Sequence, residues 1–160
     1  MVFGYQSSRD FFEAVRCAAA EARRAEQQIE RLSSAEGPRG GGMSAVGGSR
    51  RDPNGMGATD ARIDYERRMQ RRIEADRRLV SMACDLAYGR DGDGGVSALL
   101  GSEYADALWW RYCSAASWAR AGEALCVSPS TARRRCEVAM DTIDAKGEAA
   151  VMAGMGDAAA

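Results

Sequence analysis

Three consecutive arginines at positions 133–135 are the side chains in this chain best suited, by type and spacing, to contact a polyanion. They follow Ser128 and Pro129, a pair typical of a helix start, because serine can accept an unpaired backbone N–H and proline loses nothing at the first helical position. Ser117 marks a similar start eleven residues earlier. Two helices that begin so close together leave room only for a turn, so residues 117–140 predict a helix-turn-helix.

The apolar spacing in this segment agrees with two packed helices. In the first helix one face carries Trp118, Ala121 and Leu125; in the second it carries Ala132, Cys136, Ala139, Met140 and Ile143. Guanidinium groups on the opposite, outward face attract phosphates and can pair with a guanine edge in the major groove. We therefore interpret the second helix as a DNA-recognition helix, although a charge run can also belong to a merely solvated helix surface. The expected DNA-contacting residues are Ser117, Ser128, Ser130, Thr131, Arg133, Arg134 and Arg135.

A longer stretch, residues 104–144, resembles region 4 of bacterial sigma factors. That family has a leucine and an Arg-Tyr pair, a short turn, a capped helix ending in leucine, then valine-serine and a basic recognition helix. The matching residues are Leu108, Arg111, Tyr112, Ser117, Leu125, Val127, Ser128, Thr131, Arg133, Arg134 and Ala139. The layout, a helical N-terminal half followed by this module, is similar to phage and prophage regulators of the RinA/ArpU type. The resemblance spans about a quarter of the chain. It implies a sequence-specific regulator of transcription whose partner is double-stranded DNA, and whose module can also contact RNA polymerase.

Three residues in and beside the predicted turn depart from the sigma pattern. The family usually has isoleucine and alanine where this chain has Ala121 and Gly122, and glycine where it has Cys126. Glycine suits such a turn because positive φ is unfavourable for a residue with a Cβ atom. We therefore expect either an altered turn or a small backbone strain at Cys126.

The N-terminal half predicts two long helices. Apolar residues in the first follow steps of four and three, at Phe11, Val15, Ala18, Ala22, Ala25, Ile29 and Leu32. The second has an apolar stripe at Ile63, Met69, Ile73, Val80, Ala83 and Ala87. Between them residues 33–58 hold eight glycines and two prolines, a composition typical of a flexible linker. The arginines at positions 62–78 can add phosphate contacts, but we favour a solvated coiled-coil flank.

Together these patterns predict an all-α protein. Its N-terminal half is an antiparallel helical hairpin, coiled-coil-like and with a long flexible linker. A sigma region 4-like helix-turn-helix follows at the C-terminus. We expect the first coiled-coil helix at residues 1–33, the Gly-rich linker at 34–58 and the second coiled-coil helix at 59–89. A polar linker is expected at 90–101, the DNA-binding module at 102–146 and a disordered tail at 147–160. The same hairpin seam can instead pair with a second copy, giving a homodimer.

Charge is distributed unevenly along the chain. The 160 residues carry a net charge of −1, but residues 111–135 hold five arginines and one glutamate, a balance of +4. Residues 137–160 hold five acids and one lysine, a balance of −4. A basic module in a near-neutral protein suits specific, salt-sensitive DNA contact better than general coating of nucleic acid.

The composition argues against several other classes. The five cysteines form no CxxC pair and the chain has no histidine, which argues against a zinc finger and any other metal site. No cofactor motif and no cluster of acid–base or nucleophilic groups is apparent, so we expect a protein that is not an enzyme. We expect buried, reduced thiols at Cys136, on the apolar face of the second helix, and at Cys17 and Cys84, in helical stretches. No signal peptide or membrane-spanning apolar run is apparent, which predicts a cytoplasmic protein of a bacterial host cell.

Two functional alternatives from other classes stay open. The first is a small terminase-like adaptor for phage DNA packaging, since such subunits also join a helix-turn-helix to coiled-coil helices. The second is a protein-interaction module that contacts RNA polymerase without binding DNA. The cluster of Trp109, Trp110, Tyr112 and Trp118 can stack on bases, but we favour a hydrophobic centre for the module.

Overall fold

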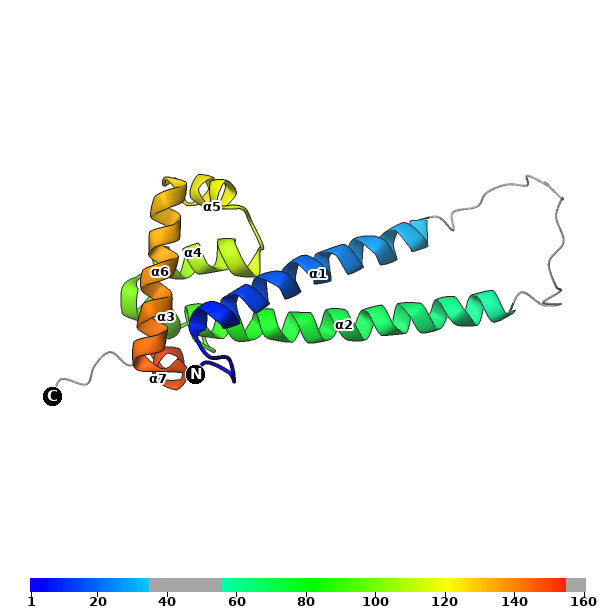
Figure 1. Cartoon of the computed structure of the whole chain (residues 1–160), viewed down its shortest axis with the longest axis horizontal. Helices are drawn as coiled ribbons and strands as arrows, with labels where there is room; N and C mark the ends of the chain where they lie inside the picture. Colours follow the sequence, from blue (N-terminus) through cyan, green and yellow to red (C-terminus); the bar gives the residue numbers. More distant parts are fainter. Residues whose placement is uncertain (35–55, 155–160) are drawn as a thin grey trace.

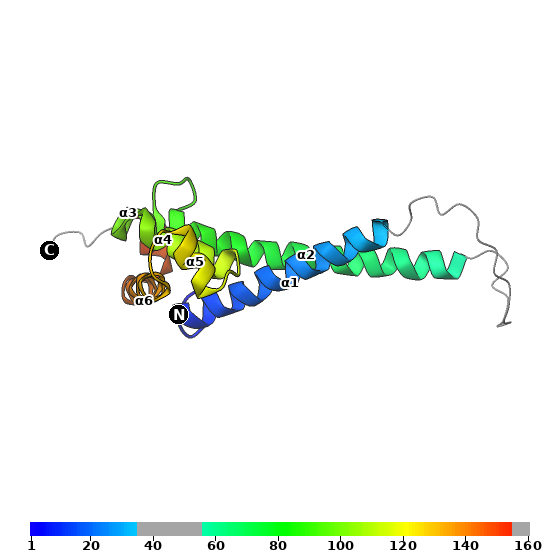
Figure 2. The ribbon, with the colours of Figure 1, turned by 90° about the horizontal axis from the view of Figure 1, so that it is seen from above.

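The computed structural model describes residues 1–34 and 56–154, and within this part of the chain every long element is a helix. The fold is therefore all-α, as the sequence predicts (Figure 1). In chain order the elements are α1 (Ser8–Ser34), α2 (Met56–Tyr88), α3 (Gly95–Leu100), α4 (Ser102–Leu108), the π-helix η1 (Trp109–Cys113), α5 (Trp118–Ala124), α6 (Pro129–Lys146) and α7 (Glu148–Met152). Figures 1 and 2 show α1 and α2 running antiparallel and extending away from the cluster of shorter helices.

The predicted seam of the hairpin is confirmed over most of α1. Phe11 and Val15 are fully buried, and the three alanines at positions 18, 22 and 25 are nearly so. On α2, Ile73, Ala83 and Ala87 are buried. Farther from the short helices the seam weakens, since Ile63 is 39% exposed. The hairpin is thus packed most tightly where it joins the rest of the molecule.

Ion pairs connect the two helices of the hairpin along its solvent-exposed edge. Arg72 pairs with Glu21, and Arg77 Nη2 lies 2.7 Å from Glu26 Oε1. Exposed pairs of this kind stabilise a fold only slightly, by about 0–1 kcal/mol each. These two arginines therefore belong to the flank of a coiled coil, the interpretation that the sequence favours.

The start of α1 is embedded among the C-terminal helices. The Phe12 ring lies 5.3 Å from the Tyr112 ring and 5.2 Å from the Phe11 ring, measured between centroids. Ser8 is completely buried; its hydroxyl donates to the Met140 carbonyl at 3.0 Å. One continuous core therefore holds both the hairpin and the helix-turn-helix.

Several expected boundaries are wrong. Residues 1–33 are not helical throughout, because α1 begins only at Ser8 and Val2 packs into the core ahead of it. The polar linker at 90–101 contains α3, whose Val96 is fully buried and whose Gly95 has φ of 70°. A Cβ atom on Gly95 would lie 2.6 Å from the Gly89 nitrogen, so glycine permits a close approach there. The glycine-rich composition of this stretch predicts only a loop.

The expectation of buried thiols is wrong at two of its three positions. Cys136 is buried, but Cys84 is half-buried and Cys17 is exposed. Position 17 lies off the seam that Val15 and Ala18 form along α1.

The expectation of a disordered tail at 147–160 is also wrong for the first residues of this range. Residues 148–152 form α7, and Val151 is fully buried. The Glu148 carboxylate accepts a hydrogen bond from the Phe3 backbone N–H, which ties this helix to the N-terminus. A single apolar residue in an alanine-rich stretch gives too little periodicity to predict such a helix. Most of the predicted linker at 34–58, and residues 155–160, lie outside the described residues; residues 56–58 belong to α2.

We expect Phe12→Ala to lower the free energy of unfolding by about 3–5 kcal/mol, because it removes a fully buried ring at the junction. Since both parts share one core, they should unfold together. Chemical denaturation followed by far-UV circular dichroism and by tryptophan fluorescence measures this, since all three tryptophans lie in residues 109–118. The control Ile63→Ala removes a partly exposed side chain and should have a much smaller effect. Separate midpoints for the two signals in the unaltered protein would contradict a shared core.

Candidate nucleic-acid interface

Two capped helices form the helix-turn-helix. The Ser117 hydroxyl accepts the Arg120 backbone N–H at 3.2 Å at the start of α5, and the Ser128 hydroxyl accepts the Thr131 N–H at 3.1 Å at the start of α6. Pro129 is the first residue of α6. Both predicted caps are confirmed, and α5 lies beside the N-terminal end of α6 (Figure 1).

The buried face of α6 is also the predicted one. Its buried residues are Ala132, Cys136, Ala139, Met140 and Ile143. Because that face is covered, Ser130, Thr131, Arg133 and Arg134 are exposed to solvent. On α5, Ala121 is fully buried, whereas Trp118 and Leu125 are partly buried. Because the buried residues of α6 lie on one face, the opposite face of its N-terminal turns is accessible to a ligand.

The turn between α5 and α6 explains glycine at position 122 and shows that cysteine at position 126 is strained. Cys126 adopts φ of 54°, the left-handed conformation in which glycine is favoured, so the expected strain is present. Gly122 is buried, and a Cβ atom there would lie 2.8 Å from the Val127 carbonyl oxygen. The Val127 N–H in turn donates to the Gly122 carbonyl at 2.9 Å. Glycine at position 122 therefore allows the chain to turn tightly onto α5.

The three arginines of α6 lie in different environments. Arg133 Nε lies 3.1 Å from Glu137 Oε1, an exposed pair one turn along the helix. Arg134 is exposed and, among the described residues, makes no ion pair. Arg135 is half-buried, since its position turns toward the packed side of the helix. Arg133 and Arg134 therefore both lie on the exposed surface of α6, and Arg135 lies at the edge of that surface.

The predicted serine and threonine contacts cluster at the helix start. The Ser128 hydroxyl lies 2.9 Å from the Ser130 hydroxyl and 2.8 Å from the Thr131 hydroxyl. Ser117 is exposed at the start of α5, where its hydroxyl serves as the cap. A helix N-terminus with exposed hydroxyls carries partial positive charge and donors suited to a phosphate.

A polar cleft of about 170 Å³ lies beside Arg133, and sequence reasoning missed part of it. Its lining includes Arg9 from α1 and Arg111 from η1. Arg111 was singled out only by the sigma resemblance. Nothing in the sequence connects Arg9 to this surface, because the contact depends on how α1 packs against α6.

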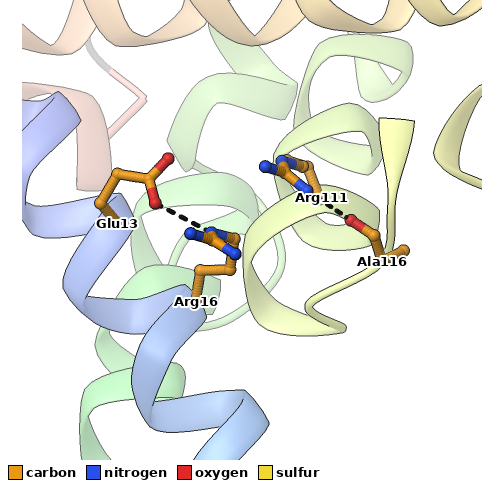
Figure 3. Close-up of polar contacts among 4 residues, drawn as sticks. All are labelled: Glu13, Arg16, Arg111 and Ala116. Carbon is orange, nitrogen blue, oxygen red and sulfur yellow. Dashed lines mark hydrogen bonds and ion pairs between the residues drawn. The ribbon is translucent and has the colours of Figure 1, made fainter. Parts of the chain in front are cut away.

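Arg111 occupies a fixed place in this cleft. Its guanidinium carbon lies 4.5 Å from the centre of the Trp118 ring, a cation–π distance, and its Nη1 donates to the Ala116 carbonyl at 2.8 Å. Figure 3 shows Arg111 near the Glu13–Arg16 ion pair of the neighbouring helix α1. Arg111 therefore couples η1 to the start of α5.

The aromatic cluster belongs mainly to the core. Tyr112 is buried, and burial raises its pKa to about 12. Its ring meets Trp118 edge to face at 6.4 Å. Trp109 is more open, at 37% exposed. The favoured interpretation of these aromatics as a hydrophobic centre is thus confirmed for Tyr112.

No family model, curated protein or solved structure matches this chain. The described residues contain no helix that is long and apolar enough to cross a membrane. Nor does this part of the chain gather three or more side chains able to hold a metal ion.

We expect Gly122→Ala to destabilise the protein by about 1–3 kcal/mol, because the added methyl would crowd the Val127 carbonyl. This outcome opposes helix propensity, which favours alanine by about 1 kcal/mol. Thermal and denaturant unfolding measure the change. The matched variant Cys126→Gly relieves positive φ in the same turn and should be neutral or stabilising. A stabilising Gly122→Ala would show that the turn is looser than described.

Proposed function

We propose that this protein is a sequence-specific DNA-binding regulator of transcription that reads the major groove with the N-terminal turns of α6. The observation that carries the proposal is the division of α6 into two faces. One face is buried in the shared core, while the other presents Arg133, Arg134 and the hydroxyls at the helix start. A rigid helix with donors at its exposed N-terminal end suits the width of the major groove.

The two exposed arginines support different parts of this function. Arg134 is exposed and makes no ion pair with any residue that the structure describes, so its guanidinium can meet a phosphate or a base edge. Arg133 is held near Glu137, but its side chain is 63% exposed, so the pair is weak and readily exchanged for a phosphate. Glu137 can itself accept a hydrogen bond from the cytosine amino group.

The charge distribution supports salt-sensitive contact at this surface. The basic excess of +4 in residues 111–135 falls on η1, α5 and the first turns of α6, whereas the chain as a whole has a net charge of −1. Arg9 of α1 adds a further positive charge at the cleft beside Arg133. Local basic charge in a near-neutral protein favours binding at one face rather than along the whole surface.

The origin and setting follow from the resemblances to sigma region 4 and to phage and prophage regulators of the RinA/ArpU type. The protein would act in the cytoplasm of a bacterial host as a phage or prophage regulator, with RNA polymerase as a further partner. The distal part of the hairpin, where Ile63 and Tyr65 are 39% and 38% exposed, would allow two copies to pair. No cofactor or enzymatic step forms part of this proposal.

A packaging adaptor is the second candidate, favoured by the long hairpin that extends from the helix-turn-helix body (Figures 1 and 2). Small terminase-like subunits act as oligomeric rings. Mass photometry or native mass measurement separates the two candidates: a monomer or dimer fits the regulator, and a ring of many copies fits the adaptor.

Arg133→Ala or Arg134→Ala should weaken DNA binding without unfolding the protein, because both side chains are exposed. If the arginine pairs with a guanine edge, its loss should cost about 1–3 kcal/mol and relax the preference at one base pair. If it contacts phosphate only, affinity should fall evenly across sequences and the salt slope should drop by about one. Fluorescence anisotropy with a genome-selected duplex over a salt series distinguishes these outcomes.

The matched control is Arg71→Ala, which removes an exposed arginine from the hairpin, where its Nε donates to the Arg67 carbonyl of its own helix. This change should leave DNA affinity nearly unaltered. If the double variant Arg133→Ala/Arg134→Ala keeps its fold, full affinity and full salt dependence, α6 is not the recognition helix. Retained binding to RNA polymerase would then favour the interaction module.

A further inference from the structure

The polar cleft beside Arg133 is lined by cationic side chains from three separate parts of the fold. Arg9 comes from the first turn of α1, Arg111 from η1 and Arg133 from α6. The cleft has a volume of about 170 Å³. Since a water molecule takes up about 30 Å³ in the liquid, this space suits one small ion with some hydration water better than a large organic ligand.

Both carboxylates that line this cleft are paired with an arginine. Glu13 Oε2 lies 2.8 Å from Arg16 Nε, one turn along α1 (Figure 3), and Glu137 Oε1 lies 3.1 Å from Arg133 Nε. The other two arginines of the cleft, from α1 and η1, make no ion pair with any residue that the structure describes. The cleft thus keeps two positive charges without a paired carboxylate, which favours an anion.

Arg111 is held in place, but its donors are not all used by the protein. The guanidinium lies over the Trp118 ring, and Nη1 donates to the Ala116 carbonyl. The Nε atom is buried and, within the described part of the chain, has no hydrogen-bond acceptor. A buried donor without an acceptor is unfavourable, and a guanidinium pairs best with an oxyanion through adjacent N–H groups. An oxyanion in the cleft would supply acceptors to this guanidinium.

Arg9 lies at a position where it does not stabilise its own helix. It is the second residue of α1, and its side chain is exposed. Because the N-terminus of a helix carries partial positive charge, a cation in the first turn is electrostatically unfavourable there. An anion bound in the cleft would supply the opposite charge that Arg9 lacks at this position.

We propose that this cleft is an oxyanion site that binds one phosphate group, with Arg9 and Arg111 as binding residues and Trp118 as a positioning residue for Arg111. Phosphate suits the site better than a planar carboxylate, because its tetrahedral oxygens can accept from guanidinium groups that approach from different elements. The phosphate belongs either to the DNA backbone beside α6, in which case the site rests on the proposed function, or to a free phosphorylated ligand. In the first case the hairpin takes part in DNA contact through Arg9.

Inorganic phosphate tests the site without DNA. Because Arg111 Nε is buried, its proton should exchange slowly with water and give a signal in a nitrogen–proton NMR spectrum of the full chain, assigned by its loss in Arg111→Lys. Phosphate, titrated at constant ionic strength against sodium chloride, should shift this signal to saturation. Broadening of the phosphorus signal of phosphate measures the same binding without the Arg111 proton.

Two variants on α1 show whether the cleft is the place of binding. Arg9→Ala should stay folded, because the side chain is exposed, and should weaken phosphate binding by about three- to tenfold. The matched control Arg24→Ala removes another exposed arginine of α1, outside the cleft, and should leave phosphate affinity unchanged.

Duplex binding over a salt series identifies the source of the phosphate. If it is the DNA backbone, Arg9→Ala should weaken binding evenly across sequences and lower the salt slope by about one. An unchanged slope, with phosphate binding retained in the unaltered protein, indicates a free phosphorylated ligand. Saturable phosphate binding by a protein that binds no duplex would contradict the proposed function and leave the site standing. The site is overturned if neither NMR signal shows saturable phosphate binding, or if Arg9→Ala binds phosphate as tightly as Arg24→Ala.

Discussion

The packing of the start of α1 among the C-terminal helices is the constraint on which the rest of this structure depends. Phe11 and Phe12 are completely buried there, and the Phe12 ring contacts Tyr112 of η1. The Ser8 N–H donates to the Asp144 carboxylate at 2.7 Å, which fixes α1 against α6. Buried aromatic rings contribute most to such cores, and a partly buried hydrogen bond adds geometric definition. The hairpin is therefore an extension of the same core and not a separately tethered unit.

This arrangement determines what α6 can present to a partner. Its inner face is occupied by contacts with α1, α4 and α5, so in its first turns only the outer face is open. Strain at Cys126 and the close approach at Gly122 set how tightly α5 turns into α6. Under the proposed function, DNA would meet a helix whose position relative to the hairpin is already fixed. Binding would then require little ordering of this surface.

Local signals in the sequence predicted the helices and their caps, since Ser117, Ser128 and Pro129 act on residues beside them in the chain. Periodicity also predicted the buried face of α6. The elements that sequence reasoning missed depend on distant packing: α3 and α7 are short, and each is recognisable only through one buried valine, Val96 or Val151. Arg9 lies far from Arg133 along the chain, so no local pattern places both at one cleft. Contacts of this kind require the tertiary fold.

The central claim, that α6 reads the DNA major groove, is tested most directly by methylation interference at guanine N7 on a duplex selected from bacterial or phage genomic fragments. N7 lies in the major groove, where arginine pairs with guanine. The account predicts that fragments selected by the full chain share a motif and that N7 methylation at particular guanines within it prevents binding. Binding that is indifferent to N7 methylation throughout the selected sites, or no selection of any fragment at low salt, would contradict it.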